Sequence, residues 1–70
     1  MAQAQDPATE IGTAIRRARK EAGLTQQQLG DLAGVSDRTL RDIESGAGRP
    51  ALRSVLSVLT VLGLQVAVTP

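Results

Sequence analysis

The sequence predicts a small all-α domain of four helices, followed by a short C-terminal β-strand. Two apolar-patterned runs within residues 25–46 are separated by Gly34, which is the arrangement of a helix-turn-helix. Residues 11–22 carry apolar side chains at helical spacing, whereas residues 64–69 show the alternation of a strand. We therefore divide the chain into a flexible N-terminal tail (1–8), a helix-turn-helix domain (9–62) and a dimerisation strand (63–70).

The composition excludes several classes of function. The 70 residues include no cysteine, no histidine and no aromatic residue. Disulfides, thiolate metal sites, histidine general bases and aromatic platforms for base stacking are therefore excluded. We expect no catalytic residue, no metal, no cofactor and no enzymatic activity. No signal peptide and no membrane-spanning segment are recognisable, so we expect a cytoplasmic protein.

Capping residues predict where the first helix begins and ends. Asp6 followed by Pro7 is one start signal, and Thr9 is a competing N-cap. The helix should run to about Ala22 and end at Gly23. The apolar residues Ile11, Ile15, Ala18 and Ala22 should fall on one face of this helix.

Two further caps delimit the helix-turn-helix. Thr25 and Gln28 fit a capping box at the start of the second helix. Gly34 can adopt the positive φ of a tight turn, and Ser36 caps the third helix, which should run to about Ser45.

The fourth helix, residues 51–62, carries more apolar surface than a small monomer needs. One apolar face comprises Leu52, Val55, Leu56, Leu59 and Leu62, and a second face comprises Val58 and Val61. A lone strand after Gly63 would leave its backbone groups unpaired, so we expect it to pair with the same strand of a second copy. The alternatives are a disordered tail or a continuation of the fourth helix. The expected dimer interface comprises Val58, Val61, Leu64, Val66 and Val68.

A helix-turn-helix indicates binding to double-stranded DNA, because the start of its second helix reaches base edges in the major groove. The expected base contacts are Ser36, Asp37, Arg38, Thr39 and Arg41. Arg38 suits a bidentate pair with guanine, whereas Asp37 must meet a cytosine amino group or pair with Arg38 or Arg41. The expected phosphate contacts are Thr25, Gln26, Gln27, Arg49 and Arg53. The net charge is only +1, but a local basic face still suits DNA, and we interpret Arg16, Arg17 and Lys20 as a solvated surface.

Residues 11–62 resemble the Xre/Cro-like phage-repressor helix-turn-helix family. The motifs that carry the resemblance are GLTQQQL (23–29), AGVSDRTL (33–40), IESG (43–46) and Arg49-Pro50. The resemblance implies that Gln26 binds a phosphate and that residues 36–39 read bases. It also implies a structural ion pair between Arg19 and Glu44. Gly30 departs from the alanine usual in the family, and because a mid-helix glycine costs about 1 kcal/mol we expect a looser second helix.

The C-terminal segment resembles that of HipB-type antitoxins, in which a long fourth helix precedes a strand that pairs across a dimer axis. This resemblance implies a homodimer that binds a palindromic operator, represses its own operon and neutralises a HipA-like kinase toxin. A free-standing Xre-type regulator of a phage or mobile element is one alternative. A protein-interaction module that does not bind DNA is another.

Overall fold

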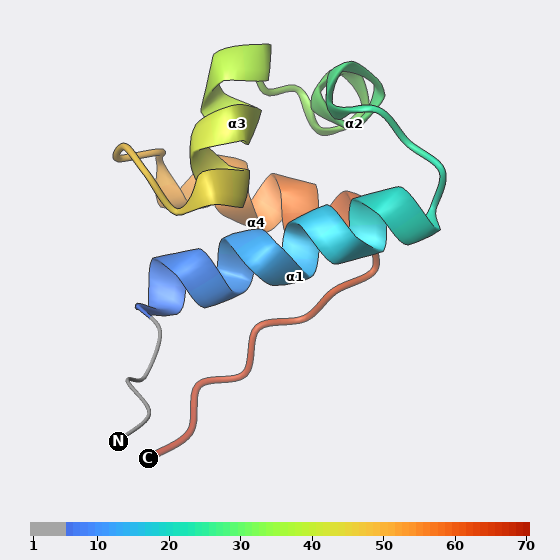
Figure 1. Ribbon diagram of the computed structural model, residues 1–70. Helices are drawn as coiled ribbons and strands as arrows, with labels where there is room; N and C mark the ends of the chain where they lie inside the picture. The colour runs from blue at the N-terminus through green and yellow to red at the C-terminus, as the bar shows by residue number, and fades with distance from the viewer. Residues whose placement is uncertain (1–5) are drawn as a thin grey trace, which may run out of the picture.

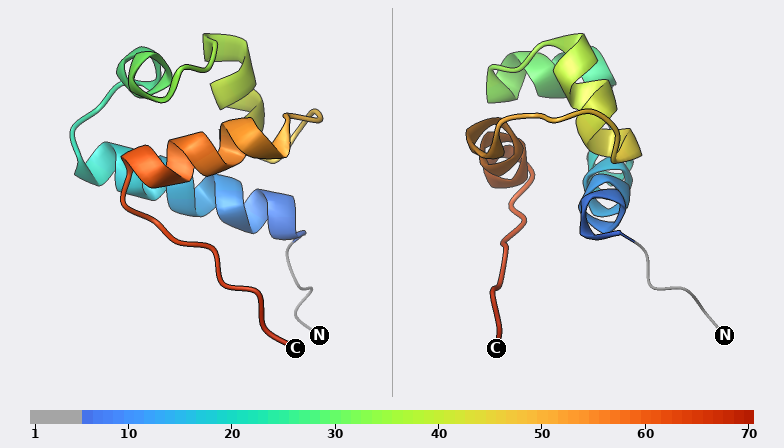
Figure 2. Two further views of the ribbon diagram at one scale, coloured as in Figure 1. Left: turned by 180° about the vertical axis from the view of Figure 1, so that it is seen from behind. Right: turned by 90° about the vertical axis from the view of Figure 1, so that its left-hand side faces the viewer.

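The computed structural model describes residues 6–70, which form four helices and the segments that join them (Figure 1). The helices are α1 (Pro7–Glu21), α2 (Gln26–Ala33), α3 (Asp37–Ser45) and α4 (Leu52–Val61). α1 and α4 lie alongside each other, and α2 and α3 cover one side of this pair (Figure 2). The predicted all-α helix-turn-helix fold is confirmed. No helix within residues 6–70 is long and apolar enough to cross a membrane.

α1 begins earlier than the expected domain boundary at residue 9. Its first residue is Pro7, and Asp6 occupies the N-cap position without a side-chain capping hydrogen bond. Thr9 therefore lies inside the first turn of α1. The expected flexible tail, residues 1–8, overlaps this turn, and its residues 1–5 lie outside the described part of the chain.

The predicted caps of α2 and α3 are both present. The Gln28 N–H donates to Thr25 Oγ1 over 3.0 Å, and the Thr25 N–H donates to Gln28 Oε1 over 2.9 Å, which completes the capping box. Ser36 Oγ accepts the N–H of Thr39 over 3.1 Å. Gly34 ends α2 with φ of 73°, a left-handed conformation that favours glycine, so the turn forms where the sequence predicts it.

Gly30 has a packing role rather than a loosening one. It is buried within α2, and a Cβ atom at this position would lie 2.8 Å from the carbonyl oxygen of Val35. The Val35 N–H in turn donates to the Gly30 carbonyl over 2.9 Å. The missing side chain therefore lets the turn fold closely against α2.

The buried core comprises Ile15, Leu29, Leu40, Ile43, Val58 and Leu59, so each helix contributes at least one side chain. Val58 has no exposed surface even in a single chain. The expectation that Val58 faces a second copy is therefore wrong. The physical reason is the rotation of α4: Val58 lies about one turn from Val55 and Leu62, which also pack against the core.

The same rotation turns other α4 side chains outward. Leu52 is 71% exposed and Leu56 is 43% exposed, so part of the larger apolar face of this helix lies outside the core. Val61 is 38% exposed and remains accessible at the C-terminal end of α4.

The C-terminal segment leaves α4 on the side of the α1–α4 pair that lies opposite α2 and α3 (Figures 1 and 2). Gly63 has φ of 71°, which ends the helix, so a continuation of the fourth helix is excluded. Leu64 still packs against the core, whereas Val66 and Val68 are 53% and 93% exposed. The described chain, residues 6–70, contains no strand, and pairing with a second copy stays a prediction.

Candidate nucleic-acid interface

A buried ion pair between Arg19 and Glu44 fastens α3 to α1. Arg19 Nε donates to Glu44 Oε2 over 2.7 Å, and Arg19 Nη2 donates to Glu44 Oε1 over 3.2 Å. Arg19 Nη1 donates to the Leu24 carbonyl over 2.8 Å, in the segment between α1 and α2. The two side chains are only 10% and 4% exposed. The pair implied by the family resemblance is thus present, and it holds three parts of the chain in a fixed relation.

The start of α2 places three of the expected phosphate contacts together. Gln26 is half-buried, and its Nε2 donates to Glu44 Oε1 over 3.2 Å. Gln27 is exposed next to it, and the hydroxyl of Thr25 accepts the capping hydrogen bond described above. The N-terminus of a helix favours negative charge, because its free N–H groups and dipole point outward. This end of α2 therefore suits an anionic oxygen.

The start of α3 carries the expected base contacts. Ser36 Oγ donates to Thr39 Oγ1 over 3.0 Å, so both hydroxyls already take part in the helix cap. Arg38 and Arg41 are exposed, and within residues 6–70 neither forms a salt bridge. The two guanidinium groups are therefore the free, long-reaching donors of this helix.

The carboxylate of Asp37 approaches α2 and forms no salt bridge with an arginine of residues 6–70. Its Oδ1 is 3.9 Å from the position that a Cβ atom on Gly30 would occupy. In the described part of the chain it forms no salt bridge, so the expected pairing with Arg38 or Arg41 is absent. Acceptance from a cytosine amino group, the other role expected of this carboxylate, stays a prediction.

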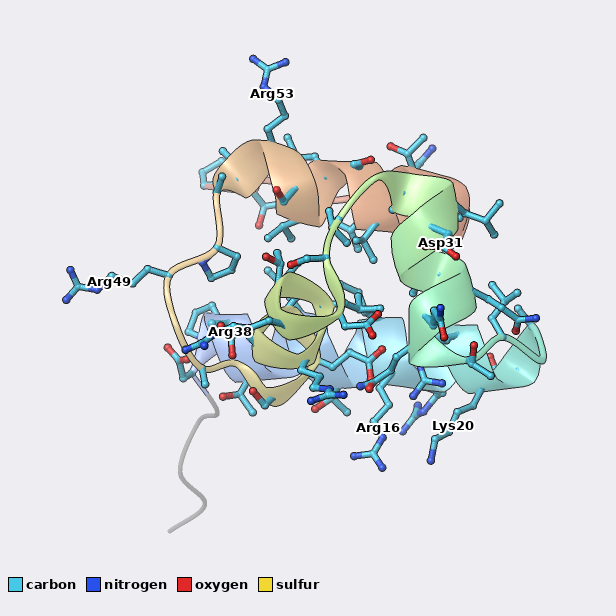
Figure 3. The ribbon with its side chains drawn as sticks, turned by 90° about the horizontal axis from the view of Figure 1, so that it is seen from above. Arg16, Lys20, Asp31, Arg38, Arg49 and Arg53 are labelled. Carbon is cyan, nitrogen blue, oxygen red and sulfur yellow. The ribbon has the colours of Figure 1, made fainter. Side chains whose placement is uncertain are left out.

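The remaining basic residues point in different directions (Figure 3). Arg38 and Arg49 project toward the same side in this view, whereas Arg53 on α4 projects away from Arg16 and Lys20 on α1. Arg53 also lines a shallow pocket beside the turn between α2 and α3. The structure thus separates Arg16 and Lys20 from Arg49 and Arg53.

Two contacts that support this surface were missed from the sequence. Ser57 Oγ of α4 donates to the Ala33 carbonyl over 2.7 Å and satisfies the C-terminal end of α2. Gly12 is buried where α1 meets α3. A signal for Gly12 was available, because it lies one heptad before Arg19 and so shares the side of α1 that faces α3. No sequence signal pointed to Ser57.

Comparisons with known proteins agree with this geometry. The model of the helix-turn-helix family HTH_3 matches residues 15–68. The HTH-type transcriptional regulator y4mF of Sinorhizobium fredii is 39% identical over 57 residues, which cover 81% of this chain and 75% of that protein. The immunity repressor protein of Bacillus phage phi105 is 41% identical over 56 residues, which cover 80% of this chain but 39% of the repressor.

Solved structures share the fold. The restriction-modification controller protein C.AhdI of Aeromonas hydrophila superposes with a TM-score of 0.73 at 26% identity, covering 83% of this chain and 88% of the controller. A chain of a HipA-HipB-O2-O3 complex superposes with a TM-score of 0.79 at 22% identity, covering 99% of this chain and 97% of that one.

Proposed function

Because the chain belongs to the helix-turn-helix family HTH_3 and is a transcriptional regulator of that type, we propose that it represses transcription by binding a palindromic operator as a homodimer. In this proposal the protein works by occupying DNA. It needs no catalytic residue, metal or cofactor.

The observation that carries the proposal is that α3 has one buried side and one exposed side that bears arginines. Leu40 and Ile43 are buried in the core, and Glu44 is tied to α1, so the helix is rigidly seated. Arg38 and Arg41 project from its exposed side without salt-bridge partners among residues 6–70. A helix held in this way can enter the major groove and offer its arginines to guanine edges.

Phosphate contacts on either side of α3 would set its position in the groove. Gln26 and Gln27 lie at the start of α2, and Arg49 lies in the loop after α3. Arg53 lies beside the turn between α2 and α3. Such contacts fix orientation but carry no sequence information.

The position of the C-terminal segment supports dimerisation. This segment leaves the domain on the side away from α2 and α3 (Figure 2), so strand pairing there leaves α3 free for DNA. Val61, Val66 and Val68 remain exposed, and pairing would cover them. A two-fold dimer of this kind would present two copies of α3 to two half-sites.

We further propose that the protein is the antitoxin partner of a HipA-like kinase toxin. The support is the likeness in shape to a chain of the HipA-HipB-O2-O3 complex over 99% of this chain, including the segment after α4. The second candidate is a free-standing regulator of phage type, and it is supported by the 41% identity to the immunity repressor protein of Bacillus phage phi105.

The test of DNA recognition begins with selection of duplexes from a random library by the full chain. We expect the selected sequences to contain two half-sites related by a two-fold axis. With Arg49 and Arg53 of two protomers as the charged phosphate contacts, four cations are involved, and affinity should fall roughly 150-fold between about 50 and 200 mM salt. Failure to select any sequence would refute the repressor and leave a protein-interaction module.

The partner is tested separately by affinity recovery of the tagged protein from its native host. A co-purifying kinase-like protein, identified by mass, would support the antitoxin role. Recovery of the homodimer alone, still able to bind its selected duplex, would favour the free-standing regulator.

A further inference from the structure

We propose that Glu44 has a second role beyond its ion pair: it is a positioning residue that presets the Gln26 amide for a DNA phosphate. This inference rests on the proposed function, because it concerns how that DNA-binding surface is prepared. The ion pair between α1 and α3 would therefore also orient a side chain at the start of α2.

The carboxylate of Glu44 is held in one orientation by three donors. Its Oε2 accepts from Arg19 Nε, and its Oε1 accepts from both Arg19 Nη2 and Gln26 Nε2. The side chain is only 4% exposed, so water has little access to it. A carboxylate fixed in this way is a rigid acceptor for the Gln26 amide.

The carboxylate of Glu44 also determines the orientation of the Gln26 side-chain amide. A carboxylate only accepts hydrogen bonds, so it selects the NH₂ group of Gln26 and turns the amide oxygen away from itself. An amide NH₂ group has two protons, and the bond to Glu44 Oε1 uses one of them. The second proton remains for an anionic oxygen at the start of α2.

The charge balance of the ion pair makes this arrangement compatible with DNA. An uncompensated carboxylate this close to Gln26 would repel a phosphate. The guanidinium of Arg19 engages both oxygens of Glu44 and neutralises that charge. Glu44 can therefore orient Gln26 without opposing the ligand.

The test is whether the effect of Gln26 on DNA affinity depends on Glu44. To remove Glu44, both members of the ion pair are replaced with methionine, because exchanging a buried ion pair for apolar residues of similar size is often tolerated. Gln26→Ala is then compared in the wild type and in the Arg19→Met, Glu44→Met background, with the duplex selected by the wild-type protein as the probe.

We expect Gln26→Ala to weaken binding by about tenfold in the wild type and by less than about threefold in the background, because an unfixed side chain must lose its freedom on binding. Gln27→Ala is the matched control: it is the adjacent, exposed glutamine, and its effect should be equal in both backgrounds. A merely structural role of Glu44 would not separate the two glutamines. An equal Gln26→Ala effect in both backgrounds would overturn the inference.

A second measurement keeps the inference testable if the methionine background does not fold. In a ¹⁵N-edited NMR spectrum of the free wild-type protein, the side-chain NH₂ protons of Gln26 should exchange more slowly with solvent than those of Gln27. Equal exchange would overturn the inference. If the wild type selects no DNA at all, the proposed function fails first and the inference fails with it, which distinguishes the two failures.

Discussion

Gly12 of α1 lies directly against the backbone of Glu44 in α3: a Cβ atom on Gly12 would lie 2.5 Å from the Glu44 carbonyl oxygen. The carbonyl oxygen of Ile43 is also within contact of that position. Neither backbone can admit a methyl group here without moving. The close approach of α1 and α3 therefore depends on the absence of a side chain at Gly12, and the same approach brings Arg19 to Glu44.

Gly12→Ala should lower the free energy of unfolding by about 2 kcal/mol. Helix propensity alone would raise it by about 1 kcal/mol, but forcing a methyl group between packed backbones costs about 3 kcal/mol. Urea denaturation followed by circular dichroism measures the difference. Thr13→Ala, at the next and exposed position, should change stability by less than about 0.5 kcal/mol. A stabilised Gly12→Ala protein would contradict the packing argument.

The sequence predicted those parts of the fold that depend on local chemistry. The capping box of Thr25 and Gln28, the cap at Ser36 and the turn at Gly34 each involve residues within a few positions of one another. Their signals are complete in a short window of sequence. The ion pair of Arg19 and Glu44 spans the whole motif, and only the family resemblance indicated it.

The errors concern how helices rotate against one another. α4 has apolar residues on several sides, so periodicity alone did not decide which side is buried. Val58, expected at a dimer interface, lies in the core, whereas Leu52 and Leu56 of the larger apolar face are exposed. Packing of α2 against α4 decides the rotation, through contacts such as Ser57 with Ala33 that couple residues 24 positions apart.

Ser57→Ala should lower the free energy of unfolding by about 1 kcal/mol, because it leaves the Ala33 carbonyl at the end of α2 without its side-chain donor. Ser54→Ala is the matched control. Ser54 is also half-buried in α4, and its side chain makes no hydrogen bond within residues 6–70. Both variants replace a half-buried serine of α4 with alanine, so the difference between their thermal unfolding midpoints reports on the contact. Equal midpoints would show that the hydrogen bond does not stabilise the fold.

Arg38→Ala should weaken binding to the selected operator more than binding to an unrelated duplex. A lost bidentate pair with guanine corresponds to about 1–3 kcal/mol, or about 5- to 150-fold in the specific dissociation constant. Arg53→Ala should instead weaken both complexes by the same factor, because a phosphate contact is independent of sequence. Gel-shift titrations with the two duplexes measure these ratios. Equal losses for Arg38→Ala would reduce its role to a phosphate contact.

Charges placed on one side of the C-terminal segment should convert the proposed dimer into a monomer. Leu64, Val66 and Val68 would share one face of a strand, whereas Gln65 and Ala67 would share the other. Val66→Lys with Val68→Lys should therefore halve the mass measured by light scattering, because the lysines would have to be buried between copies. Both valines are exposed in the single chain, so the substitutions should change the thermal unfolding midpoint of the monomer no more than other surface substitutions do.

The matched control is Gln65→Lys with Ala67→Lys, which adds the same charge to the opposite face and should leave the proposed dimer intact. If both pairs of substitutions lower the mass alike, the segment associates without the alternation of a strand; if neither does, dimerisation does not use it.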